Sequence, residues 1–199
     1  MQHFRFTFVI GSNMNINLQN MEPVKLIEAC KKGDSRAQVE IYKRYYKAMY
    51  NIALRMLNDT AEAEDVMQES FLSAFQKMDT FSGSVTFGAW LKKIVINRSL
   101  DVIKSRKALI SLESVPELPE DTSSENYLDY RELNIEMVKR AIFDLPDGYR
   151  VVLSLYLVEG YDHDEISEIL GITNATSRTQ YHRARKQLAK KLNELKAVS

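Results

Sequence analysis

Residues 166–188 read ISEILGITNATSRTQYHRARKQL and contain two helical patterns separated by one glycine. In the first pattern Ile166 and Leu170 stand one helical turn apart, as on the inner face of an amphipathic helix. Gly171 follows at once, where a left-handed residue commonly ends a helix. The basic, polar pattern after it begins at Thr173, a residue suited to capping a helix. The stretch predicts a helix-turn-helix.

The second of these helices has two contrasting faces. Small and apolar residues recur at three- and four-residue spacing and are expected to face the domain: Ser177, Tyr181, Ala184, Leu188 and Leu192. The opposite face is basic and polar: Arg178, Thr179, Gln180, His182, Arg183, Arg185 and Lys186. In a major groove Arg can bond guanine and Gln can bond adenine, each through two hydrogen bonds. The pattern favours a DNA-recognition helix; an ordinary helical hairpin with a basic surface is the alternative.

Charge is segregated along a chain that is neutral as a whole. The 199 residues include 27 Lys and Arg and 27 Asp and Glu, so no global field steers the protein to DNA or to a membrane. Acidic blocks occupy residues 58–69 and 111–130, and basic blocks occupy residues 91–107 and 174–196. Two separate basic helices favour a polyanion that is held at two places.

Helical periodicity continues through most of the chain. With only 7 Gly and 4 Pro and no alternating strand pattern, the sequence predicts an all-α fold. Helices are expected over residues 23–32, 34–57, 61–78, 87–107, 132–144, 147–158, 162–170 and 173–196. The predicted organisation is a disordered extension (1–23), a first helical domain (24–107), an acidic flexible linker (108–131) and a second helical domain (132–199).

Several classes of protein are disfavoured. Cys30 is the only cysteine, so no disulfide can form within the chain, which fits a reducing cytoplasm. The three histidines lack the spacing of metal ligands. The sequence shows no P-loop, no nucleophile motif and no paired carboxylates in a pocket pattern, so we expect neither an enzyme nor a cofactor. No run approaches the roughly 20 apolar residues of a membrane span.

Two longer stretches resemble one bacterial family. LPDGYRVVLSLYLVEGYDHDEISEILGIT, followed by HRARKQL, resembles the C-terminal promoter-binding domain of extracytoplasmic-function (ECF) sigma factors. AEDVMQESFLSAFQKMDTFSGSVTFGAWLKKIVINRSLDVIKSRK resembles their N-terminal domain. The resemblance covers residues 24–107 and 132–195 in the order of the family. It implies a non-enzymatic factor that joins core bacterial RNA polymerase, recognises the −10 and −35 promoter elements and starts transcription, with an anti-sigma factor as inhibitory partner.

The resemblance also implies roles for individual residues. Those expected to bind polymerase are Asp65, Gln68 and Glu69. Those expected at the −10 element, around the loop of residues 82–89, are Phe81, Trp90, Lys92, Lys93, Asn97 and Arg98. Those expected to face the bases of the −35 element are Arg178, Thr179, His182 and Arg183. Those expected at its phosphate backbone are Thr176, Gln180, Arg185 and Lys186.

Two departures from the usual family string bear on the recognition helix. The usual string Gly-Thr-Val-Lys/Arg-Ser-Arg is replaced by Ala-Thr-Ser-Arg-Thr-Gln at residues 175–180. Ser177 stands where an apolar residue is usual, which is expected to weaken the anchor of the helix slightly. Gln180 stands where a basic residue is usual, so one contact to a DNA phosphate is expected to be missing. The sequence therefore does not predict which −35 bases are read, although it does predict recognition by this helix.

Other interpretations remain at this stage. A stand-alone helix-turn-helix regulator would need neither a polymerase-binding face nor a loop that melts DNA. An all-α enzyme and an adaptor without affinity for DNA are the further alternatives. For the acidic linker, the family implies a path through polymerase toward the RNA exit, because a polyanionic peptide can occupy a channel built for RNA; a plain solvated tether is the alternative.

Overall fold

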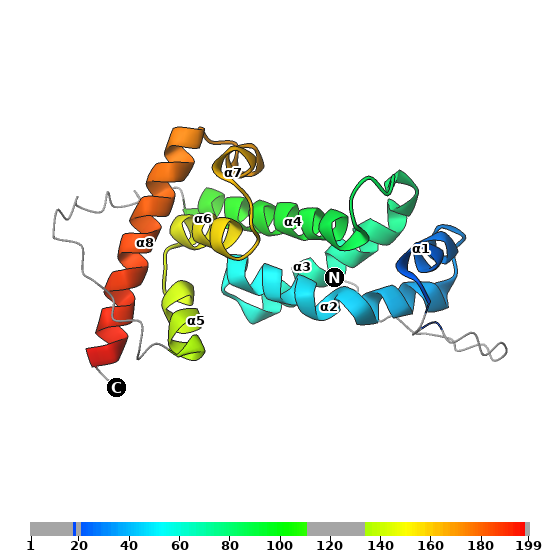
Figure 1. Cartoon of the computed structure of the whole chain (residues 1–199), viewed down its shortest axis with the longest axis horizontal. Coiled ribbons are helices and arrows are strands. Elements are labelled where there is room, and N and C mark those ends of the chain that lie inside the picture. Colours follow the sequence, from blue (N-terminus) through cyan, green and yellow to red (C-terminus); the bar gives the residue numbers. More distant parts are fainter. Residues whose placement is uncertain (1–17, 19–20, 111–133, 198–199) are drawn as a thin grey trace.

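The computed structural model describes Leu18, residues 21–110 and residues 134–197, and places side chains within these ranges except at 107–110 and 197. The helices in chain order are α1 Pro23–Lys31, α2 Ser35–Leu57, α3 Thr60–Gln76, the short 3-10 helix η2 Met78–Thr80, α4 Phe87–Ile110, α5 Ile135–Phe143, α6 Asp147–Leu157, α7 His163–Leu170 and α8 Asn174–Ala197 (Figure 1). No strand occurs among the described residues. The predicted all-α fold is confirmed.

The N-terminal domain, α1 to α4 with η2, is built on three long helices. Figure 1 shows α2, α3 and α4 lying lengthwise, and each packs against the other two. The inner faces of α2 and α4 supply six large side chains that are fully buried: Ile41, Met56, Leu57, Leu91, Val95 and Ile96. Asp34 caps α2 and Asp59 caps α3 by accepting backbone N–H bonds. The amphipathic periodicity of the sequence therefore corresponds directly to the packed faces.

The C-terminal domain, α5 to α8, is arranged around its last helix. α5, α6 and α7 all pack against α8, which Figure 1 shows running along the end of the molecule. Leu145, Leu153 and Ala184 form a small buried cluster there. Val151, Leu155 and Ile166 belong instead to the large cluster that fills the N-terminal domain. The two domains therefore share a continuous apolar core through α6 and α7.

The carboxyl end of α2 is the polar anchor of this junction. The last carbonyl groups of a helix have no partner within the helix and lie at the negative end of its dipole. Arg150 of α6, which is 3% exposed, donates to the carbonyl of Met56 at 3.2 Å and to that of Leu145 at 2.7 Å. Arg106 of α4 donates to the carbonyl of Leu57 at 3.0 Å. Two guanidinium groups from different domains thus donate hydrogen bonds to the last carbonyl groups of one helix.

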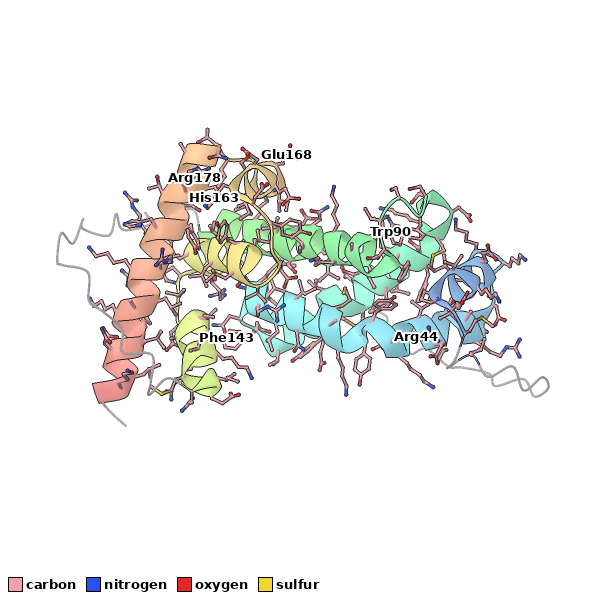
Figure 2. All side chains as sticks on the ribbon, in the orientation of Figure 1. Arg44, Trp90, Phe143, His163, Glu168 and Arg178 are labelled. Atoms are coloured by element: carbon pink, nitrogen blue, oxygen red, sulfur yellow. The ribbon has the colours of Figure 1, made fainter. Side chains whose placement is uncertain are left out.

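The described boundaries differ from the predicted ones at three places. The end of the extension predicted to be disordered is held in place: Leu18 and Met21 pack against the core, and Arg44 donates to their carbonyls at 2.7 and 3.0 Å (Figure 2). α4 continues to Ile110, past the predicted start of the linker. α5 begins at Ile135 and not at 132. Residues 1–17 and 19–20 of the predicted extension and residues 111–131 of the predicted linker lie outside the described residues.

The anchor predicts a specific loss of stability. Arg150→Ala removes a buried donor and leaves the carbonyls of Met56 and Leu145 without it, so we expect the free energy of unfolding to fall by about 1–3 kcal/mol. Lys139→Ala is the control, because the Lys139–Glu136 pair is largely exposed and its loss should change stability by about 0.5 kcal/mol or less. Urea unfolding followed by circular dichroism measures both. An equal loss of unfolding free energy in the two variants would contradict the role of Arg150 as an anchor of the junction.

Burial also predicts the reactivity of Cys30. Its side chain is 4% exposed, and burial, with a smaller contribution from the charge of Asp34, raises the pKa of the thiol to about 12. The thiolate is the reactive form, so the native protein should react slowly with a disulfide reagent at mildly alkaline pH. The same protein in urea should react as fast as free cysteine. Equal rates in the native and denatured protein would show that Cys30 is accessible.

Candidate nucleic-acid and protein interfaces

The turn between α7 and α8 has the geometry that the sequence predicted. The Asp162 carboxylate accepts from the N–H of Glu165 at 2.8 Å, and the Glu165 carboxylate accepts from the N–H of Asp162 at 2.9 Å. This is the capping box of α7. Gly171 ends the helix with φ of 66°, and the Thr173 hydroxyl accepts from the N–H of Thr176. Both helices of the helix-turn-helix are therefore fixed at the turn by local side chains.

A buried polar contact joins the two helices beneath the turn. Ser177 is fully buried, and its hydroxyl lies 2.9 Å from Nδ1 of His163, the first residue of α7. The imidazole ring stacks on Tyr156 of α6, at 4.7 Å between ring centres, and meets the edge of Tyr181 of α8. The weaker anchor expected at Ser177 therefore stays a prediction, to which the structure adds a buried hydrogen bond that an apolar residue could not form.

The outer face of α8 presents the residues predicted to contact the −35 element. Seven of them are exposed and Gln180 is half-buried: Thr176, Arg178, Thr179, Gln180, His182, Arg183, Arg185 and Lys186. Ser177, Ala184 and Leu192 are buried on the opposite side, and the partly buried Leu188 packs with them. Figure 2 shows Arg178 toward the α7 end of α8. One rigid helix thus carries the whole set toward solvent.

An aromatic cluster supports the start of α4. Phe81, Phe87 and Trp90 lie with ring centres 5.4 to 5.7 Å apart, and Tyr45 adds an edge contact to Phe87. Phe81 is only 8% exposed, whereas Trp90 is partly exposed. The ring of Phe81, which the resemblance assigned to the −10 element, is therefore part of the core and supports Trp90 from beneath. Of the two rings, Trp90 presents surface to a ligand (Figure 2).

The loop between η2 and α4 stands out into solvent. Residues 82–86 are all exposed. Gly83 has φ of 79°, a left-handed conformation that suits glycine. The hydroxyl groups of Ser82 and Ser84 lie 2.9 Å apart. The loop is therefore short, polar and placed directly beside the aromatic cluster.

The basic residues of α4 fall into two groups. Lys93 and Asn97 are exposed, and together with Trp90 they follow the spacing of one side of a helix. Arg98 is exposed and forms an ion pair with Glu69 of α3 at 3.4 Å. Lys92 is not with them: its ammonium group lies 3.4 Å from the carboxylate of Glu159, in the segment between α6 and α7. The structure thus brings five of the six predicted −10 residues to one region and places Lys92 at the domain junction.

The third predicted surface lies on α3. Asp65, Gln68 and Glu69 are exposed and follow the spacing of one helical face. Leu72 continues this face and is 42% exposed. Acidic groups on such a surface favour a partner of complementary, basic charge. The face differs in charge from the basic surfaces of α4 and α8.

The described ranges contain neither a metal-binding cluster nor a helix that could span a membrane. Within them, no group of three or more His, Cys, Asp or Glu side chains is placed to hold a metal ion. None of the described helices combines the length and the apolar character needed to cross a membrane.

Family models match both domains. The description Sigma-70 region 2 matches residues 41–109, and Sigma-70, region 4 matches residues 135–188. The first match contains α3, the exposed loop and α4, and the second contains the helix-turn-helix. The surfaces on α3, α4 and α8 therefore all lie in segments characteristic of sigma factors.

Individual proteins that are similar to this chain are also sigma factors. ECF RNA polymerase sigma factor SigW of Bacillus subtilis is 32% identical over 186 residues, which cover 86% of this chain and 97% of SigW. The ECF RNA polymerase sigma-E factor of Escherichia coli is 29% identical, with 85% and 94% covered. Two solved structures share the fold: RpoE of Bartonella quintana with the anti-sigma factor NepR (TM-score 0.54, 21% identity, covering 77% and 95%) and CnrH with the cytosolic domain of CnrY (0.53, 22%, 86% and 97%). The chain belongs to the ECF family of RNA polymerase sigma factors.

Proposed function

We propose that α8 of this sigma factor reads the −35 promoter element through Arg178, Thr179, His182 and Arg183. The observation that supports this most directly is the exposure of all four side chains on one face of a helix whose opposite face is buried. An exposed helix held by a helix-turn-helix fits a major groove. The flanking residues Thr176, Gln180, Arg185 and Lys186 hold the phosphates on either side and set the register.

The −10 element is opened by the N-terminal domain. In this proposal a base leaves the stack and lies against Trp90, with Asn97 as its polar partner and the loop of residues 82–86 beside it. Lys93 and Arg98 bind the adjoining phosphates. Phe81 acts through Trp90, which it supports from the core. The partial exposure of Trp90 beside a polar loop is the observation in favour of this assignment.

Core polymerase is bound by α3. Asp65, Gln68 and Glu69 form the acidic part of the contact and Leu72 the apolar part. Charge on such a surface governs the choice of partner and the rate of association, and buried apolar area supplies affinity. With polymerase bound in this way, the protein directs transcription initiation at specific promoters and carries out no chemistry itself.

The junction between the two domains occupies one of the residues predicted to bind DNA, Lys92. Lys92 is bound by Glu159, and its ammonium group lies 5.1 Å from the centre of the Tyr161 ring. Arg55 of α2 donates to the same carboxylate at 2.5 Å. Lys92 can therefore bind a promoter phosphate only after the segment between α6 and α7 has moved away. In this proposal the free protein holds its domains together and polymerase separates them.

A regulatory partner and a location complete the proposal. Two solved proteins that share the fold are RpoE, in complex with an anti-sigma factor, and CnrH, in complex with the cytosolic domain of CnrY. We infer that this chain also has an anti-sigma factor. Because its polymerase and promoter partners are in the cytoplasm, and its one cysteine forms no disulfide within the chain, it acts there.

Arg178 provides the test of −35 recognition. Arg178→Ala should weaken binding of the reconstituted holoenzyme by about 1–3 kcal/mol and relax the base preference at one −35 position, because a base-specific contact is lost. Lys190→Ala is the control: Lys190 is exposed on the same helix but outside the assigned set, and its loss should leave base preferences unchanged. Binding to a duplex pool randomised at −35 measures both. An equal loss on every sequence contradicts base reading by Arg178.

Asp65 provides the test of polymerase binding. Asp65→Arg should lower the affinity for core polymerase about tenfold or more, because reversed charge meets a basic partner, while the circular dichroism spectrum and melting temperature stay unchanged. Glu28→Arg is the matched control, since Glu28 is an exposed acid on a different helix, α1, outside the assigned face. Titration of labelled protein with core polymerase measures affinity. Wild-type affinity in the Asp65 variant would remove α3 from the contact.

A further inference from the structure

Arg178 is the last member of a chain of side-chain hydrogen bonds that begins on α7. The carboxylate of Asp164 accepts from Nδ2 of Asn174 at 2.5 Å. Oδ1 of the same Asn174 accepts from Nε of Arg178 at 2.7 Å. Asn174 and Arg178 lie four residues apart on α8, the spacing at which side chains of a helix meet. The first turn of α7 is thereby linked through one amide to the guanidinium of Arg178, which is exposed on α8.

Capping of the helices does not account for these two hydrogen bonds. Asp162 already caps α7 through its own carboxylate, and Thr173 already accepts from the N–H of Thr176 at the start of α8. The carboxylate of Asp164 lies beside the first residue of the recognition helix, where promoter phosphates would repel it. Its place in the first turn of α7 suits the dipole of that helix, but this interaction does not require the bond to Asn174.

The bond to Asn174 fixes how Arg178 can present its donors. A guanidinium carries five N–H donors in a planar fork. The bond to Asn174 uses the one on Nε, and the donors on the two terminal nitrogens are not used by it. With Nε held, the plane of the fork is set and its open end is directed along the side chain. That geometry matches the O6 and N7 acceptors of guanine, which lie side by side in the major groove.

We propose that Asn174 and Asp164 are positioning residues that hold Arg178 for end-on, two-bond recognition of a guanine in the −35 element. The proposal rests on the assignment of Arg178 to base reading made above. Asn174 orients the guanidinium, and Asp164 orients the amide of Asn174 so that its oxygen points to Arg178. These hydrogen bonds thus lower the affinity for DNA of any sequence and increase discrimination at one base pair.

The test measures base preference and affinity separately. Holoenzyme reconstituted with the full chain is bound to duplexes randomised at −35, and bound and free pools are sequenced. Asn174→Ala should lower the preference for guanine at the Arg178 position about fivefold, the ratio that one net hydrogen bond produces, with other positions unchanged. Glu168→Ala, which removes another exposed acid of α7, is the control and should leave this preference at the wild-type value.

An exchange variant distinguishes positioning from a merely structural role. In Asp164→Asn with Asn174→Asp the amide and the carboxylate trade places: the new amide donates, and the new carboxylate accepts from both it and Arg178. The net charge is unchanged, and the preference for guanine should return to at least the wild-type level. Failure of this rescue, or a loss at all −35 positions in Asn174→Ala, overturns the proposal.

Arg178→Ala in the same assay separates this inference from the assignment beneath it. If Arg178→Ala abolishes the guanine preference and Asn174→Ala leaves it intact, the positioning role is wrong and base reading by Arg178 stands. If Arg178→Ala changes no base preference, both are wrong. Loss of the preference in Arg178→Ala, a partial loss in Asn174→Ala and rescue by the exchange variant support both together.

Discussion

The carboxyl end of α2 is the point on which the rest of the structure depends. A helix that ends inside a protein needs partners for its last carbonyl groups, and here the partners are guanidinium groups of two other helices. Arg106 ties α4 to this end, and Arg150 ties α6 to it. Because Arg150 is almost fully buried, this polar contact and the shared apolar core around Val151 and Leu155 form one junction. The position of α6 then fixes α7 and α8.

This junction relates the two candidate DNA surfaces to each other. α8 is carried on α6 and α7, so its exposed face keeps a defined orientation within the C-terminal domain. The same packing brings Glu159 to Arg55 and Lys92, which neutralises charge at the inner end of the basic surface of α4. A neutral chain with alternating acidic and basic blocks can pair them internally in this way. Separation of the domains would then expose charge that promoter DNA needs.

Local signals predicted much of this structure. Gly171 at the turn and Thr173 at the start of the second helix act within a few residues, so the sequence alone was sufficient to predict the helix-turn-helix. Contacts between distant residues were not predictable: Glu159 meets Lys92 across 67 positions. The burial of Phe81 was missed because a loop residue has no periodicity to indicate a face. The pair Asn174 and Arg178 did carry a signal, its four-residue spacing, whereas the direction of an amide side chain emerges only from its partners.

The central claim is that this protein, with polymerase, recognises two separate promoter elements through two domains. Run-off transcription tests it most directly, with purified protein, core bacterial RNA polymerase and promoters randomised across both elements. The account predicts start sites that depend on the protein and that are preceded by two enriched motifs at a fixed separation. Start sites with a single motif would contradict the division between α4 and α8. Binding to DNA without any dependent start site would contradict the account as a whole.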